Sequence, residues 1–129
     1  MVTDIQQCCT LLGTSDDILI LCHKSPDGDT IGAAYGLYHA LTHIASGCGE
    51  TAPIRCRRSS ATSTGALSCR SLSPGWIVAV DIASTNLLGA GLEQYADRID
   101  LCIDHHVSNS DYARLTLVDS RAAAACEIM

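Results

Sequence analysis

The stretch DILILCHKSPDGDTIGAAYGLYHALTHIAS, residues 17–46, decides the fold that we expect for this chain. Its first part, residues 17–22, is a continuous apolar run of strand length, typical of a strand that is covered on both faces. From Thr30 to Ser46 apolar residues recur at helical spacing, which predicts a helix. The turn between them carries one imidazole and two carboxylates, those of His23, Asp27 and Asp29.

The rest of the chain continues this alternation of strands and helices. The further elements that we predict are a helix over residues 3–13, strands over 76–81, 98–106 and 113–119, a short helix near 86–96, and a helix that follows Ser120 as its N-cap. Alternation of this kind predicts an α/β fold, with a mainly parallel sheet flanked by helices. At 129 residues, the chain is expected to form one domain.

Composition narrows the classes of function. The net charge is −6 and the chain has no run of Lys or Arg that could serve as a nucleic-acid or membrane footprint. No apolar stretch has the length of a membrane span, and the first ten residues do not form a secretory signal. None of the eight cysteines belongs to a C-x-x-C pair, so we expect reduced, mostly buried thiols. These features predict a cytoplasmic protein without a membrane partner.

Polar residues gather where the predicted strands end. Asp81 ends the second strand, and the triplet Asp104, His105 and His106 ends the third. Because the carboxyl ends of parallel strands share one edge of a sheet, these residues should meet those of the first turn there. Several unpaired carboxylates in one place would repel each other, and divalent cations relieve this repulsion. Mixed Asp and His ligands favour Mn²⁺, Zn²⁺ or Fe²⁺ over Ca²⁺, so we expect such a metal site at the carboxyl ends of the strands.

Each part of the pattern has a simpler explanation when it is taken alone. The residues PDGD at 26–29 suit a turn, and Asp81 could cap a helix. His23 could be a hydrogen-bonded histidine beside a strand, and residues 104–106 could be a polar loop. The combination, in this order and at the strand ends, favours the metal site.

The combination resembles the DHH phosphoesterase family. The triplet that names the family stands at residues 104–106, its motif H-x-x-x-D-x-D at residues 23–29, and its lone aspartate after an apolar strand at Asp81. The stretches HKSPDGDTIGAAYGLYHAL, DHHVSN and LTLVDSRAAAACEI are most similar to a bacterial subgroup, the bifunctional oligoribonucleases and pAp phosphatases (nanoRNases). The resemblance covers most of the chain except residues 51–75.

This resemblance implies a site for two Mn²⁺ ions. His23 and Asp27 would bind one ion, and Asp29 and His105 would bind the other. Asp81 would bridge the two ions. Two metal ions about 3.5–4 Å apart can activate a water and neutralise charge on phosphoryl oxygens.

The resemblance also implies a substrate and the residues that face it. His106 would contact the substrate phosphate, Asp104 would orient the histidines, and Asn109 would shape the loop beside them. The reaction would be hydrolysis of a short oligoribonucleotide or of the 3′-phosphate of pAp. The full-length protein could be a homodimer.

The sequence departs from the family pattern in several places. The chain ends at Met129 before the fourth motif of the family and its C-terminal substrate-binding domain, so we expect an incomplete catalytic domain over residues 1–129 with weak activity alone. Residues 51–75, rich in Arg, Ser and Cys, form an atypical connection that looks like translation in a disturbed reading frame. Ala33 stands where the subgroup usually has Ser, and Asp119 is expected to cap the last helix rather than bind metal.

Two alternatives stay open. Other activities of the family, those of cyclic-dinucleotide phosphodiesterases, single-strand exonucleases and class-II pyrophosphatases, share the same motifs. A non-catalytic metal- or nucleotide-binding remnant would keep the motifs and lack turnover. Titration with Mn²⁺, with and without a phosphodiester, would distinguish the remnant from an enzyme.

Overall fold

The structure is a computed structural model that describes residues 1–15, 17–47, 74–89 and 91–129, with the backbone alone for residues 42–47. Most of the segment 51–75 lies outside the described residues, and with it the prediction of an exposed, atypical connection. Cys48, Cys56 and Cys69 lie outside them as well.

Four short strands form one sheet in which every described pair is parallel. They are β1 (Ile18–Leu21), β2 (Trp76–Val80), β3 (Leu101–Asp104) and β4 (Leu115–Val118), in this order across the sheet. In the register of the sheet, Ala79 pairs with Leu21 of β1 and with Cys102 of β3. The α/β fold with a mainly parallel sheet is confirmed, and each strand lies within its predicted range. Because the strands are parallel, their carboxyl ends share one edge.

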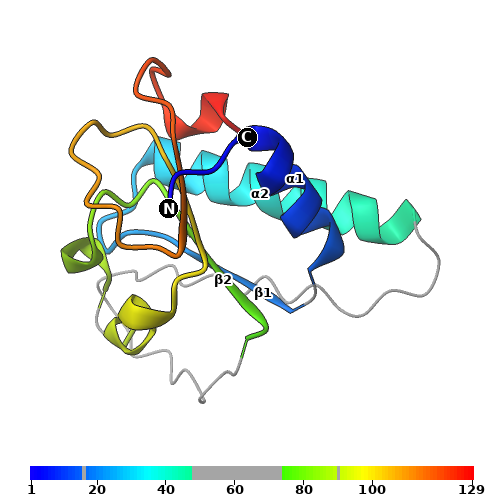
Figure 1. Cartoon of the computed structure of the whole chain (residues 1–129), viewed down its shortest axis with the longest axis horizontal. Coiled ribbons are helices and arrows are strands. Elements are labelled where there is room, and N and C mark those ends of the chain that lie inside the picture. Colours follow the sequence, from blue (N-terminus) through cyan, green and yellow to red (C-terminus); the bar gives the residue numbers. More distant parts are fainter. Residues whose placement is uncertain (16, 48–73, 90) are drawn as a thin grey trace.

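Apolar side chains cover both faces of the sheet, as its continuous apolar runs predict. In β1, Ile18 and Ile20 pack in the same cluster as residues of the helices α1 (Ile5–Thr14) and α2 (Gly28–Gly47), whereas Leu19 and Leu21 belong to the cluster on the other face. Figure 1 shows the two helices together on one side of the strands. Full burial of one such side chain stabilises the fold by about 1.5–3 kcal/mol, so both faces drive assembly of the sheet.

Side-chain carboxylates begin both helices. Oδ1 of Asp4 accepts the backbone N–H of Gln7 at 2.8 Å and caps α1. Helix α2 begins at Gly28, two residues before the predicted start, because Oδ1 of Asp27 accepts the backbone N–H groups of Asp29 and Thr30 at 3.0 Å each. No helix among the described residues combines the length and the apolar character needed to cross a membrane.

The helix predicted near residues 86–96 is wrong in type. The chain forms two 3-10 segments there, η1 (Thr85–Leu87) and η2 (Glu93–Arg98). Gly91 lies between them with a φ of +87°, a left-handed conformation that a helix interior does not allow. Leu88, which follows η1, and Tyr95 of η2 pack against the sheet face opposite to α1 and α2.

The helix predicted after Ser120 is also wrong. Turns follow β4, and the only regular element that the structure describes beyond them is a 3-10 turn, η3 (Ala125–Glu127). The N–H groups of Ala125 and Cys126 donate to the side chain of Asp29, and Oε2 of Glu127 accepts the N–H of Ala123. The backbone hydrogen bonds of the segment are of the 3-10 type, since the N–H of Glu127 donates to the carbonyl of Ala124 and that of Ile128 to the carbonyl of Ala125.

The cysteines that the structure describes take part in no disulfide bond. Cys8 and Cys102 are buried, as predicted, whereas Cys9 and Cys126 are exposed. The prediction of mostly buried thiols therefore holds for only part of the described set.

Candidate metal centre

Polar residues from three segments meet at the carboxyl edge of the sheet, around a cavity of about 250 Å³. The cavity is lined by His23, Lys24, Ser25, Asp27, Asp29, Asp81, Leu87, His105 and His106. The five predicted metal ligands and His106 all belong to this lining, and they come from the turn before α2 and its first turn, the end of β2 and the end of β3. The parallel sheet therefore brings together what the sequence separates by more than 80 residues.

Asp81 lies at the centre of this group and carries two signs of strain. Its φ is +58°, in the left-handed region that few non-glycine residues adopt. Oδ2 accepts the hydroxyl of Thr30 at 2.5 Å, whereas the buried Oδ1 has no hydrogen-bond partner among the described residues. Burial raises the pKa of Asp81, against the opposing effect of the Thr30 hydrogen bond. A buried carboxylate oxygen without a partner is costly, and a bound cation would satisfy it.

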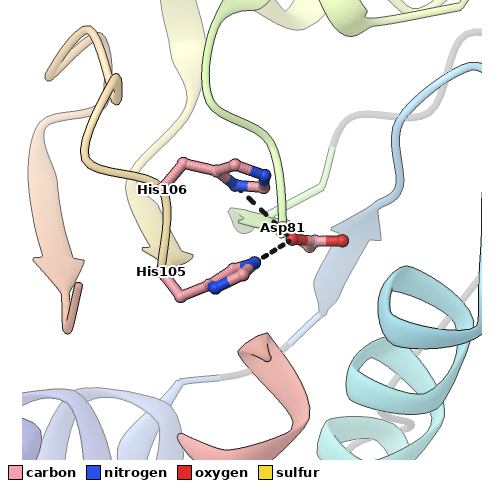
Figure 2. A group of neighbouring side chains, drawn as sticks. All are labelled: Asp81, His105 and His106. Atoms are coloured by element: carbon pink, nitrogen blue, oxygen red, sulfur yellow. Dashed lines mark ion pairs between the residues drawn. The ribbon is translucent and has the colours of Figure 1, made fainter. Parts of the chain in front are cut away.

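Potential ligands approach Asp81 from two sides. Nε2 of His105 lies 3.6 Å and Nδ1 of His106 3.7 Å from Oδ1 of Asp81. Figure 2 marks both pairs with dashed lines. Nε2 of His23 lies 3.9 Å from Oδ2 of Asp81. Ligand atoms of Asp81, His23 and Asp27 lie within 4.8 Å of one another, and so do those of Asp81, His105 and His106. Asp81 is common to both groups, as a residue between two cations would be.

The second group differs from the predicted set, because it contains His106 where Asp29 was expected. Asp29 is nevertheless close, since its Oδ2 lies 3.6 Å from Nε2 of His105. The ring atom of His106 that approaches Asp81 is Nδ1, and this atom also lies 2.7 Å from Oδ1 of Asp104. A nitrogen that donates its proton to a carboxylate has no lone pair for a cation. When Nε2 is also protonated, His106 has no lone pair for a cation and can present this N–H to an anion.

Asp104 is buried and orients both histidines without lining the cavity. Its Oδ1 accepts the backbone N–H groups of His105 and His106, at 2.8 Å and 3.2 Å, besides Nδ1 of His106. Its Oδ2 accepts Nδ2 of Asn109 at 2.6 Å. The hydrogen bond to Asp104 raises the pKa of His106 above its usual range, even though burial acts in the opposite direction. Asp104 thus favours the protonated form of His106, and Asn109 in turn holds Asp104.

His105 and Asp29 are both held by the last described segment of the chain. Nδ1 of His105 lies 3.3 Å from the carbonyl oxygen of Ala122, and the tautomer that donates to this carbonyl leaves Nε2 with a lone pair. Asp29 accepts two backbone N–H groups, from Ala125 at 2.7 Å and from Cys126 at 2.8 Å. Burial alone would raise the pKa of Asp29, but the hydrogen bonds from Cys126 and Ala125 outweigh it and keep the carboxylate ionised.

Asp27 has a similar electrostatic setting at the start of α2. Its hydrogen bond from the backbone N–H of Thr30 is the main reason for its lowered pKa, and His23 contributes in the same direction. Both carboxylates of the turn, Asp27 and Asp29, are thus ionised at neutral pH and able to bind a cation.

Sequence reasoning missed several contributors to the site. Thr30 holds Asp81 by its buried hydroxyl, and its place directly after the second aspartate of the turn was the available signal. Lys24 lines the cavity and donates from Nζ to the carbonyl of Asn86 at 3.2 Å, which places one positive charge at the rim. The backbone of residues 122–126 contributes as well; these residues belong to a stretch that carries the family resemblance, but their contacts with Asp29 and His105 were not predicted.

Asp119 lies apart from this site, as predicted for a residue with a structural role. It does not line the cavity, and its Oδ1 accepts both the backbone N–H and Nε of Arg121 at 3.1 Å each. It therefore stabilises the turn after β4 and does not cap a helix at Ser120.

Comparisons with known proteins bear on the family and the fold of the chain. Residues 17–129 match the model of the DHH family, N-terminal domain. Among solved structures, the fold is similar to that of an exopolyphosphatase-related protein from Bacteroides fragilis, with a TM-score of 0.66 and 22% sequence identity. The similarity covers 96% of this chain and 41% of that protein, so the chain spans about two fifths of its length.

Proposed function

We propose that the cavity of this chain, which belongs to the DHH family, is the catalytic centre of a metal-dependent phosphoesterase. The observation that carries the proposal is the shared position of Asp81, which belongs to both groups of potential ligands and has a buried oxygen without a hydrogen-bond partner among the described residues. The donor set of carboxylates and imidazoles suits Mn²⁺ and related divalent cations.

Two Mn²⁺ ions fit the residues that are present. His23 and Asp27 would hold one, Asp29 and His105 would hold the other, and Asp81 would contact both. When bound, the ions would supply an activated water and positive charge for the phosphoryl oxygens of a substrate. The ionised state of Asp27 and Asp29, which their hydrogen bonds favour, is the state that binds a cation.

The remaining polar groups would act on the substrate. His106, held by Asp104 and partly exposed to the cavity, would donate Nε2–H to a phosphoryl oxygen. The hydrogen bond to Asp104 raises the pKa of His106, which favours the protonated donor. Lys24 at the rim would attract the negative charge of a further phosphate group.

For the substrate, we propose a short oligoribonucleotide or the 3′-phosphate of pAp, on the basis of the sequence resemblance to that subgroup. The structural likeness to an exopolyphosphatase-related protein lies at 22% identity and supports the fold alone. The overall negative charge of −6 is compatible with a phosphate substrate, because the cations would supply the positive charge.

The test is a calorimetric titration of the chain with Mn²⁺, followed by hydrolysis assays on pAp, a diribonucleotide and a short polyphosphate. We expect two bound ions in the unmodified chain and none in Asp81→Asn. Asp119→Asn is the matched control, because it removes a carboxylate that lies outside the cavity. Failure to bind Mn²⁺ would overturn the metal site, and binding without hydrolysis of any substrate would favour a non-catalytic remnant.

A further inference from the structure

The segment Ala122–Cys126 contacts two of the proposed ligands at once. The N–H groups of Ala125 and Cys126 donate to the two oxygens of Asp29, at 2.7 Å and 2.8 Å, and the carbonyl of Ala122 lies 3.3 Å from Nδ1 of His105. Asp29 and His105 are also the pair proposed to hold one cation, and their facing atoms are 3.6 Å apart. One short piece of backbone therefore fixes the relative position of both side chains.

The segment passes close to Gly32, where an added side chain would crowd the thiol of Cys126. A Cβ built on Gly32 would lie 2.8 Å from Sγ of Cys126, closer than real Cβ atoms come to a neighbour. Sγ is itself held, since it lies 3.2 Å from the backbone carbonyl of Asp29 and donates to it. Gly36, one turn further along α2, is different, because its Cβ would meet Cβ of Met129 at an ordinary 3.8 Å.

We propose that Gly32 and the segment Ala122–Cys126 are positioning residues for the cation held by Asp29 and His105, an inference that rests on the proposed metal site. A side chain at position 32 would displace Cys126, and with it the N–H groups that orient Asp29. The carbonyl that fixes the tautomer and direction of His105 belongs to the same segment and would move too. Among the residues that the structure describes, no hydrogen bond joins His23 or Asp27 to the segment, so the group formed by these two residues would be unaffected.

Loss of the partners that orient metal ligands typically lowers metal affinity by about 10–100-fold. We therefore expect Gly32→Ala to weaken binding of one Mn²⁺ by at least about 10-fold and to leave the other within about twofold. Gly36→Ala is the matched control, since it makes the same chemical change on the same helix and gains the same helix propensity. We expect both Mn²⁺ affinities of Gly36→Ala to stay within about twofold of the unmodified chain, because no contact there is tighter than ordinary packing.

A second variant tests the direction of the effect. In Gly32→Ala with Cys126→Ala, the thiol that would clash is removed while the backbone N–H groups remain, so the weakened Mn²⁺ site should recover. Cys126→Ala alone completes the double-mutant cycle. Electron paramagnetic resonance gives the signature, because two neighbouring Mn²⁺ ions give a coupled signal. That signal should be lost in Gly32→Ala at two equivalents of Mn²⁺ and return in the double variant.

A readout without metal separates this inference from the proposed function. In the metal-free chain, amide hydrogen exchange at residues 125 and 126 should be faster in Gly32→Ala than in Gly36→Ala, because Asp29 no longer accepts those N–H groups. Unchanged exchange in Gly32→Ala, equal Mn²⁺ loss in both glycine variants, or no recovery in the double variant would each overturn the positioning role. Absence of Mn²⁺ binding by the unmodified chain would instead overturn the metal site and the inference that rests on it.

Discussion

Oδ1 of Asp81 lies 3.6 Å from Nε2 of His105, although one residue follows β2 and the other follows β3. The parallel pairing of these neighbouring strands creates this approach, because it places their carboxyl ends side by side. Asp81 is nearly fully buried and strained in φ, so the approach has no evident benefit for stability alone. Strain and an unsatisfied buried oxygen at one residue are features expected of a functional site.

The first prediction concerns Asp81→Asn and thermal stability. Without metal, the neutral amide removes the desolvation cost of a buried carboxylate and can still accept the Thr30 hydroxyl, so the melting temperature should stay equal or rise. With Mn²⁺ at 100 times its Kd, the unmodified chain should gain about 2.7 kcal/mol for each ion, and the variant should not. Thermal unfolding in EDTA and in Mn²⁺ measures both effects. A lower melting temperature of the variant in EDTA would mean that Asp81 has a structural role.

Asp104→Asn should destabilise the fold and loosen His106. Both oxygens of Asp104 accept hydrogen bonds, from two backbone N–H groups, from His106 and from Asn109. In Asp104→Asn, an amide NH₂ replaces one of these oxygens and faces an N–H donor that it cannot accept. The buried groups left unpaired should lower the free energy of unfolding by about 1–3 kcal/mol. Denaturant unfolding measures the free energy of unfolding. Asn109→Ala, which removes only one of the four donors, should cost less, and an equal cost would contradict the network.

Much of the fold could be predicted from the sequence because its signals are local. The apolar runs of β1, β2 and β3 are continuous and of strand length, so burial on both faces and a parallel sheet follow from them. The positions of Asp27, Asp81 and His105 then follow from topology, since parallel strands share a carboxyl edge.

The failures have physical causes of their own. The short helix predicted near residues 86–96 does not form, because Gly91 adopts a left-handed conformation that interrupts it. The alanine-rich stretch after Ser120 has high helix propensity, yet hydrogen bonds from its amides to Asp29 determine its course. Tertiary contacts of this kind join residues almost a hundred positions apart, and a local pattern cannot reveal them.

The buried thiol of Cys102 should resist alkylation in the folded chain. Burial raises its pKa to about 11, despite hydrogen bonds from Tyr112 and Asn109, and only the thiolate reacts. At pH 8 iodoacetamide should therefore label the exposed Cys9 and leave Cys102 unmodified. Peptide mass spectrometry measures both sites in one sample, and labelling in urea confirms that each can react. Rapid labelling of folded Cys102 at pH 8 would show that this face of the sheet opens.

The last prediction separates the two adjacent histidines. His105 directs Nε2 toward Asp29 and Asp81. His105→Ala should therefore lower the affinity for one Mn²⁺ by at least about 10-fold, because even the loss of a residue that only orients a metal ligand has an effect of this size. Nδ1–H of His106 donates to Asp104. His106→Ala should therefore leave the Mn²⁺ content nearly intact. It should lower kcat by about 100-fold or more, the usual contribution of a positioned proton donor. Elemental analysis after desalting measures the metal, and hydrolysis of the best substrate measures turnover. Equal Mn²⁺ loss in both variants would make His106 a ligand, and would assign the group formed by Asp81, His105 and His106 to the cation in place of Asp29.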